Sequence, residues 1–191
     1  RLGVGLVIIN DQSKIFTGRR LDSTKAWQMP QGGIDDNEIP LEAAYREMFE
    51  ETGIEKCKVS LLKQSKIWYR YDLPKEIQGK FWGGKFRGQS QKWFLFRFNG
   101  SDKDINIHTK HQEFSDWKWS KKTDMLQFIV PFKKSLYHSV LKDFELDFKN
   151  YQTKHKGDNS TSDKTDLSVI YQGDWEFKDI TSDTSSNLIW W

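Results

Sequence analysis

The segment from Gly32 to Ile54, GGIDDNEIPLEAAYREMFEETGI, constrains the fold more than any other part of the chain. Its apolar residues recur at helical spacing after Pro40, which suits a first turn because its missing N–H costs nothing there. The pattern stops at Gly53, and glycine favours the left-handed conformation that ends helices. We therefore predict a helix that begins near Pro40 and ends at Gly53.

Three carboxylates lie on one face of this predicted helix. Glu47, Glu50 and Glu51 are related as i, i+3 and i+4. Such crowding is unfavourable without a counter-charge, which a hard cation such as Mg²⁺ supplies through oxygen ligands. A tight turn at the glycine pair could bring the carbonyl of Gly32 to the same metal. Glutamate-rich faces are usually only solvated, so the helix alone leaves both interpretations open.

The complete spacing resembles the Nudix box: Gly32, Glu38, Arg46-Glu47, Glu50-Glu51, Gly53 and the apolar residues between them. The resemblance extends to segments on both sides of the box. These look like the branch that contains bacterial RNA pyrophosphohydrolases and diadenosine polyphosphate hydrolases, and they are 27–31, 69–74, 88–94 and 113–119. The similarity covers about residues 1–149.

The resemblance implies an α/β fold, an α/β/α sandwich with a mixed sheet, and a magnesium site in which manganese could substitute. Carried over by position, Glu47, Glu50 and Glu51 are metal ligands, Gly32 lends a carbonyl, and Glu113 joins from a later loop. Arg46 is expected to hold a helix carboxylate in place and Glu38 to orient the site. Glu50, Glu51 and Glu113 all remain candidates for the group that takes the proton.

Substrate contacts are also carried over from the resemblance. The expected substrate-binding residues are Arg19, Gln31, Tyr71, Gln89, Phe132 and Lys133. Phe132 is a candidate for stacking on a base, with a place in the core as the equally supported alternative. Residues 80–88, KFWGGKFRG, mix basic and aromatic side chains, which is the composition of a single-strand nucleic-acid contact and also of a loop fixed by its tryptophan.

Alternating apolar residues predict strands elsewhere in the chain. A hairpin of Leu2–Asn10 and Ile15–Thr17 is followed by strands at Val59–Leu62, Ile67–Tyr71, Trp93–Phe98 and Asp116–Trp119. Apolar residues at 136, 140, 141 and 144 predict a helix over 133–148. We expect a domain over 1–149 and a C-terminal extension over 150–191, with a polar linker at 150–166 and a short hairpin within 167–180.

The composition adds general constraints. The 13 Phe, 9 Trp and 6 Tyr predict an aromatic-rich core. A single cysteine, Cys57, excludes an internal disulfide and is interpreted as a small apolar residue in a reducing compartment. No apolar run has the length of a membrane span, so we expect a cytoplasmic protein. The net charge is +3 and the acidic excess falls after residue 149, which leaves the first part positive, as suits a polyanionic substrate.

Three functions follow as hypotheses. The first is an enzyme that removes pyrophosphate from the triphosphorylated 5′ end of RNA. The second is a hydrolase of diadenosine polyphosphates, which would use the same catalytic residues. The third, from another class, is a non-catalytic RNA-binding module, and the complete box speaks against it.

Overall fold

Two apolar strands that are far apart in the sequence form the centre of the sheet. In the computed structural model, which describes residues 1–156 except Thr24 and Phe81 and no side chains beyond residue 150, β1 (Leu2–Ile9) and β7 (Gly88–Phe98) pair in parallel along their shared length. Both are buried along most of this length, as expected of strands covered on both faces.

The other strands are antiparallel to their neighbours, so the eight-stranded sheet is mixed. The main order is β3-β2-β1-β7-β5, while β4 pairs with β1, β6 with β7 and β8 with β2. The remaining strands are β2 (Ile15–Arg20), β3 (Trp27–Gln28), β4 (Gln31–Gly33), β5 (Val59–Gln64), β6 (Tyr69–Asp72) and β8 (Phe114–Ser120). The predicted hairpin is confirmed as β1–β2, and β7 and β8 are longer than the strands we predicted.

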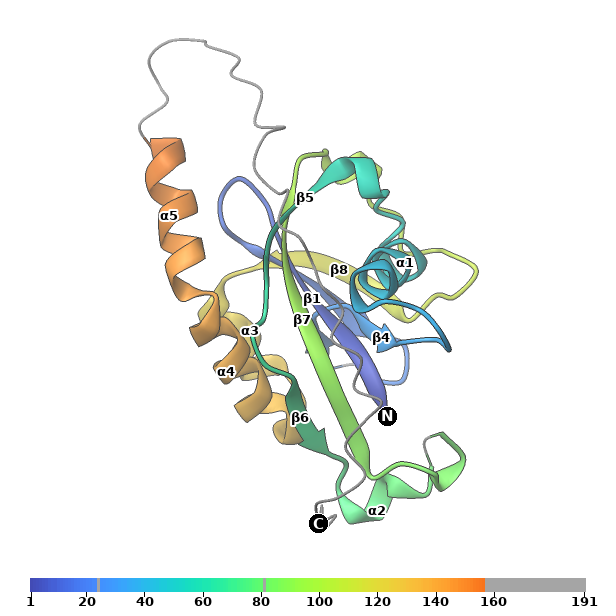
Figure 1. Cartoon of the computed structure of the whole chain (residues 1–191). Helices are drawn as coiled ribbons and strands as arrows, with labels where there is room; N and C mark the ends of the chain where they lie inside the picture. The colour runs from blue at the N-terminus through green and yellow to red at the C-terminus, as the bar shows by residue number, and fades with distance from the viewer. Residues whose placement is uncertain (24, 81, 157–191) are drawn as a thin grey trace. The chain divides into compact units, whose positions relative to one another are not determined.

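Helices cover both faces of the sheet (Figure 1). On one face α1 (Pro40–Thr52) packs Ala44 and Met48 against even-numbered residues of β7, such as Phe94. On the other face α4 (Lys134–Asp143) packs Leu136, Tyr137, Val140 and Leu141 around Trp93. The fold is therefore the predicted α/β sandwich, and its fully buried aromatic side chains confirm an aromatic-rich core.

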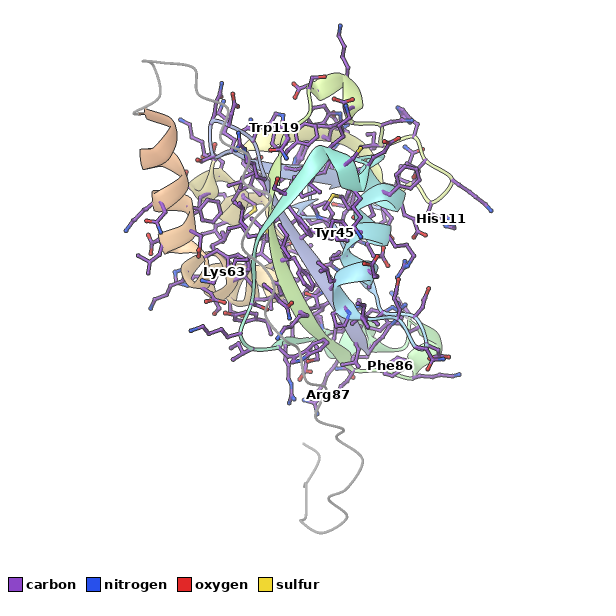
Figure 2. All side chains as sticks on the ribbon, turned by 45° about the horizontal axis from the view of Figure 1, so that its top comes forward. Tyr45, Lys63, Phe86, Arg87, His111 and Trp119 are labelled. Atoms are coloured by element: carbon purple, nitrogen blue, oxygen red, sulfur yellow. The ribbon has the colours of Figure 1, made fainter. Side chains whose placement is uncertain are left out.

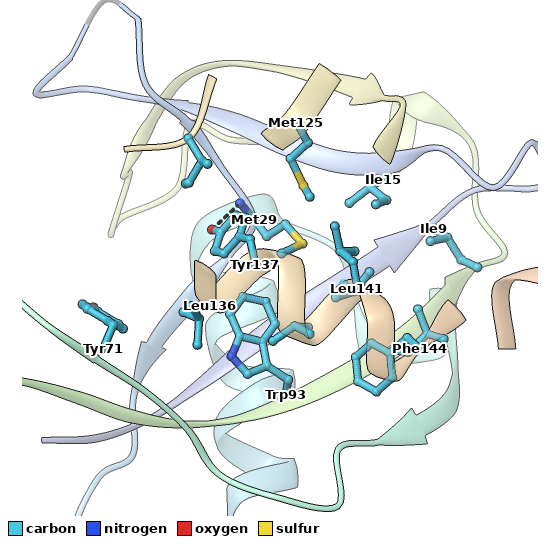
Figure 3. Close-up of a cluster of buried hydrophobic side chains, with 14 of the residues drawn as sticks. Ile9, Ile15, Met29, Tyr71, Trp93, Met125, Leu136, Tyr137, Leu141 and Phe144 are labelled. Atoms are coloured by element: carbon cyan, nitrogen blue, oxygen red, sulfur yellow. Dashed lines mark hydrogen bonds between the residues drawn. The ribbon is translucent and has the colours of Figure 1, made fainter. Parts of the chain in front are cut away.

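The α4 side of the core is organised around Tyr137 (Figure 3). Its ring meets Trp93 edge to face with 5.5 Å between centroids, and its hydroxyl accepts a hydrogen bond of 3.0 Å from the Met29 amide. Met29 directly precedes Pro30 and β4. The contact therefore fixes the strand that carries the glycine pair of the box.

The predicted helix over 133–148 is two helices. Pro131–Lys133 forms the 3₁₀ turn η4, α4 begins at Lys134, and the chain leaves helical geometry at Phe144 before α5 (Glu145–Lys156). Phe144 is fully buried, so the break places its ring in the core. α5 continues into the segment for which we predicted a linker, and the predicted hairpin within 167–180 lies outside the described residues.

Short elements complete the described part of the chain. They are α2 (Lys75–Gln78), α3 (Lys122–Phe128), η1 (Lys56–Lys58), η2 (Trp82–Gly84) and η3 (Asp102–Asp104). Within the described residues no helix is long and apolar enough to cross a membrane. Cys57 in η1 is exposed and its thiol lies 3.4 Å from a carboxylate oxygen of Glu55, so interpreting it as an apolar side chain was wrong.

Candidate active site

A cavity of about 500 Å³ opens where β4, β6, α1, η4 and the loop before β8 meet. The box contributes Gly32, Glu47, Glu50 and Glu51 to its lining, and Glu113 joins them from the loop. Every acidic residue that we predicted as a metal ligand therefore faces the same space. α1 presents these residues because it has the predicted ends: Pro40 lies in the first turn and Gly53 ends the helix at φ 68°.

Arg46 holds the acidic residues at the edge of this cavity. Its Nε and Nη2 donate to the two carboxylate oxygens of Glu38, each at 2.8 Å, and Nη2 also donates to the Gly33 carbonyl at 2.8 Å. Nη1 donates to Glu47 at 2.9 Å and to Glu50 at 3.3 Å. A forked guanidinium can make all these bonds at once, which a lysine could not. These contacts are of the kind that we expected for Arg46, which pairs with helix carboxylates, and for Glu38, which accepts two of the hydrogen bonds.

Glu51 is the most strongly perturbed carboxylate of the site. It is 1% exposed, and one of its oxygens accepts a hydrogen bond of 3.2 Å from the Gln31 amide. The other, Oε1, is buried without a hydrogen-bond partner. Burial, and then the nearby charges of Glu113 and Glu47, raise the pKa of Glu51 well above its usual range. A buried acceptor of this kind calls for a cation or a proton.

Glu47 shares this environment, and burial raises its pKa to about 6 although Arg46 opposes the shift. Its carboxylate lies directly against Gly32. A Cβ on residue 32 would be 1.8 Å from the Glu47 Cδ atom, a separation that real Cβ atoms do not show. The absence of a side chain at Gly32 therefore makes room for the carboxylate.

These observations fit a divalent cation. Among the described residues no three carboxylate, histidine or cysteine side chains are gathered closely enough to hold a metal ion as they stand, and Arg46 binds an oxygen of Glu47 and of Glu50. The donors are nonetheless hard oxygens, one of them buried without a partner, beside a backbone turn that no Cβ fills.

Lys133 lines the same cavity as the glutamates and carries the opposite charge. Its ammonium group is buried and donates to the Gln31 side chain at 2.9 Å and to Gln28 at 3.4 Å. Burial, reinforced by the positive charge of Arg20, lowers the pKa of Lys133 to about 7, although Glu51 and Glu113 oppose the shift. A cation held so close to the carboxylates is suitably placed for a phosphate chain.

The remaining predicted contacts form one polar and aromatic wall. The Tyr71 hydroxyl donates to the Gln89 side chain at 2.9 Å, and Gln89 also accepts a hydrogen bond of 2.8 Å from Gln91. The Phe132 ring lies 5.8 Å from that of Tyr71. Phe132 packs against the core and also lines the cavity, and its stacking on a base stays a prediction.

Arg19 does not reach the cavity, and Arg20 lines it instead. The Arg19 guanidinium lies 3.5 Å from Asp116 and donates to the Ser115 hydroxyl at 3.1 Å. Successive residues of β2 point to opposite faces of the sheet, so only one of the two arginines can face the cavity. Choosing Arg19 was therefore wrong, and Arg20 takes its place, hydrogen-bonded to Asp22 and to Gln28 at 3.2 Å.

Other residues also line the cavity. His111, which was not predicted, comes from the loop before β8 and lies beside α1 (Figure 2), and Trp82 comes from η2, within residues 80–88 that we singled out for their basic and aromatic side chains. Gln28 stands two residues before Pro30 in a segment that carried the family resemblance, which was the only sign of its importance. For His111 the sequence offered no signal beyond its proximity to Glu113.

Residues 1–140 match the NUDIX domain. The match spans the strands, α1 and the cavity residues described above. The chain belongs to the NUDIX family, as its box predicted. Hydrolysis in this family generally needs divalent cations, in agreement with the donor set of the cavity.

Two relatives define its place within the family. The RNA pyrophosphohydrolase of Rickettsia typhi is 51% identical over 146 residues, which cover 76% of this chain and 89% of that protein. The RNA pyrophosphohydrolase of Cereibacter sphaeroides is 51% identical over 142 residues, 74% of this chain and 88% of that protein. The prediction of this branch is confirmed.

Solved structures share the fold at lower identity. Dihydroneopterin triphosphate pyrophosphohydrolase of E. coli superposes with a TM-score of 0.60 at 16% identity, covering 72% of this chain and 92% of that one. Ap4A hydrolase of C. elegans superposes with a TM-score of 0.55 at 22% identity, covering 78% and 98%. At these identities the likeness concerns the fold alone.

Proposed function

We propose that the protein is a divalent-cation-dependent RNA pyrophosphohydrolase, which converts the triphosphorylated 5′ end of RNA to a monophosphate. The observation that carries the proposal is the buried pair Glu47 and Glu51, with one Glu51 oxygen lacking a hydrogen-bond partner, in a cavity that is also lined by Lys133. Relatives of about half identity that are named RNA pyrophosphohydrolases support the choice of substrate.

The proposed cation is Mg²⁺, with Mn²⁺ as a substitute. Glu47, Glu50, Glu51, Glu113 and the carbonyl of Gly32 would hold it. When bound, such ions offset the charge of bridging phosphates and lower the pKa of coordinated water. The choice of magnesium rests on the all-oxygen donor set and on the substrate phosphates, which complete its shell readily.

The protein's own residues supply positioning and proton transfer. Arg46 hydrogen-bonds to Glu47 and Glu50 and so positions their carboxylates beside the cavity. Lys133 and Arg20 would face the phosphate chain, while Phe132 and Tyr71 offer an aromatic wall to the 5′ base. We assign proton acceptance to Glu51, because its Oε1 oxygen is buried at the cavity without a hydrogen-bond partner.

Hydrolysis of dinucleoside polyphosphates is the comparison activity. It would use the same carboxylates, and the C. elegans Ap4A hydrolase shares the fold. The test is a side-by-side measurement of kcat/KM on triphosphorylated RNA and on diadenosine tetraphosphate, with Mg²⁺ present. We expect the larger value on RNA. A larger value on the dinucleotide would reverse the assignment, and no turnover of either would favour an RNA-binding module.

A further inference from the structure

A short segment with basic and aromatic residues follows β6 in the chain and reaches the cavity. We call Ile77 of α2, Trp82 of η2 and the lysines Lys80 and Lys85, which lie on this segment, the Trp82 wall. Ile77 and Trp82 line the cavity, whereas both lysines are exposed. None of these residues has a role in the reaction that we propose at the carboxylates.

The loop that carries this wall is tied down at its base. The Leu73 amide donates to the Arg87 carbonyl at 2.7 Å, and the Gln78 side chain donates to the Leu73 carbonyl at 2.8 Å. Figure 2 shows Phe86 and Arg87 at the same end of the domain. Two hydrogen bonds therefore hold the base of this loop.

Trp82 has an unusual backbone. Its φ is 50°, and Gly83 and Gly84 follow at 63° and 74°, so three successive residues are left-handed. Glycine adopts this conformation freely, whereas a bulky side chain does so only at a cost. The turn leaves the Trp82 ring half-buried at the cavity, with its neighbour Phe86 approaching at 75° and 6.4 Å. Such an outlier in the lining of a cavity suggests a functional role for the ring.

Both charged residues of the Trp82 wall are positive. Among the described residues, neither Lys80 nor Lys85 forms an ion pair, in contrast to Arg87, which is paired with Asp72. An indole at the cavity, with exposed lysines two residues before it and three residues after it in the chain, matches the chemistry of single-stranded nucleic acid, which offers a flat base and a phosphate on every unit.

We propose that the Trp82 wall binds the single-stranded RNA that follows the first nucleotide, with a base stacked on Trp82 and phosphates held by Lys80 and Lys85. The inference rests on the proposed function, because the triphosphate must occupy the carboxylate end of the cavity for the next nucleotides to reach its rim. It adds a second binding region, outside the catalytic centre, that favours an RNA over a lone nucleotide.

The test compares two substrates in the full chain. One is a short triphosphorylated oligoribonucleotide, and the other is adenosine tetraphosphate, which has no following nucleotide. For Trp82→Leu we expect KM for the oligonucleotide to rise about tenfold, because a base–aromatic stack is lost, with kcat and the values for adenosine tetraphosphate unchanged. Trp82→Phe should restore most of the loss. Trp68→Leu, a tryptophan outside the cavity lining, is the matched control.

The lysines are tested by salt dependence. Affinities are measured in the Glu51→Gln background, so that neither probe is turned over. Removal of Lys80 and Lys85 together should reduce the slope of log affinity against log salt by about 1.4, since each phosphate contact to a single strand contributes about 0.7. Lys103→Ala, in the exposed turn η3, should leave the slope unchanged.

Two results would overturn the proposal. Equal effects of Trp82→Leu on both substrates would place Trp82 at the first nucleotide, and no effect on either would remove it from binding. If instead the parent protein produces no monophosphorylated RNA, the proposed function fails, while the affinity series still decides whether the wall binds RNA.

Discussion

The backbone of Gly32 and the carboxylate of Glu47 occupy adjoining space so closely that a Cβ on residue 32 would lie 1.8 Å from the Glu47 Cδ atom. Because Gly32, the first residue of the box, has no side chain, β4 can approach α1 closely enough for the Glu47 carboxylate to lie against the strand backbone. Any side chain at position 32 would have to displace Glu47.

Gly32→Ala is expected to lower kcat by about a hundredfold, the loss typical of a catalytic group displaced by about 1 Å. The matched control is Gly79→Ala, because Gly79 has a right-handed backbone and nothing lies within 4 Å of an added Cβ. Steady-state kinetics on adenosine tetraphosphate compares the two. Equal activity of the Gly32 variant and the control would mean that the position of Glu47 does not matter.

The ion pair of Glu38 and Arg46 predicts a loss of stability in acid. Hydrogen bonds from Arg46 lower the pKa of Glu38 below its ordinary value of 4.5, so the pair stabilises the fold above that pH and the contribution is lost as pH falls through the lowered value. Thermal melting of the parent and of Glu38→Gln should therefore differ most near neutral pH and converge in acid. A difference that is constant from neutral pH into acid would contradict this.

For Lys133 we predict the opposite contribution: its burial lowers stability near neutral pH, and this loss is recovered as the pH rises. Its folded pKa of about 7 lies below the ordinary 10.5, so between these values the unfolded chain binds one more proton than the folded protein and stability rises with pH. Relative to Lys133→Met, the parent should gain a few kcal/mol across this window. Urea denaturation at several pH values measures the gain, with Lys103→Met as the control. Parallel curves for parent and Lys133→Met would show that the buried ammonium titrates normally.

Tyr137→Phe tests the connection between the core and β4. The variant leaves the buried Met29 amide without its acceptor, so we expect a loss of about 1–3 kcal/mol in the free energy of unfolding (Figure 3). Urea denaturation provides the value. A loss smaller than about 0.5 kcal/mol would mean that another acceptor replaces the hydroxyl.

The box and the strands were predictable because local patterns determine them. Pro40 and Gly53 mark the ends of α1, and the i, i+3, i+4 spacing brings its carboxylates together. The break at Phe144 had no such signal, since neither glycine nor proline marks it. The burial of the Phe144 ring, a tertiary effect, overrides the helical period there.

The substrate side of the site was predicted less well for a similar reason. Consecutive residues of a strand point to opposite faces, so only one of Arg19 and Arg20 can face the cavity. Which of the two does so depends on how the rest of the fold packs on the sheet, and the local sequence does not show this. Trp82 reaches the cavity through three left-handed residues, a geometry that Gly83 and Gly84 permit but do not predict.

The most direct test of the central claim is the analysis of 5′ ends after incubation of triphosphorylated RNA with Mg²⁺ and either the parent chain or Glu51→Gln. We predict monophosphorylated RNA with the parent, and with the variant a loss of turnover of at least about a hundredfold while the affinity for RNA is retained. Monophosphorylated ends formed equally well by Glu51→Gln, or none formed by the parent, would contradict the account.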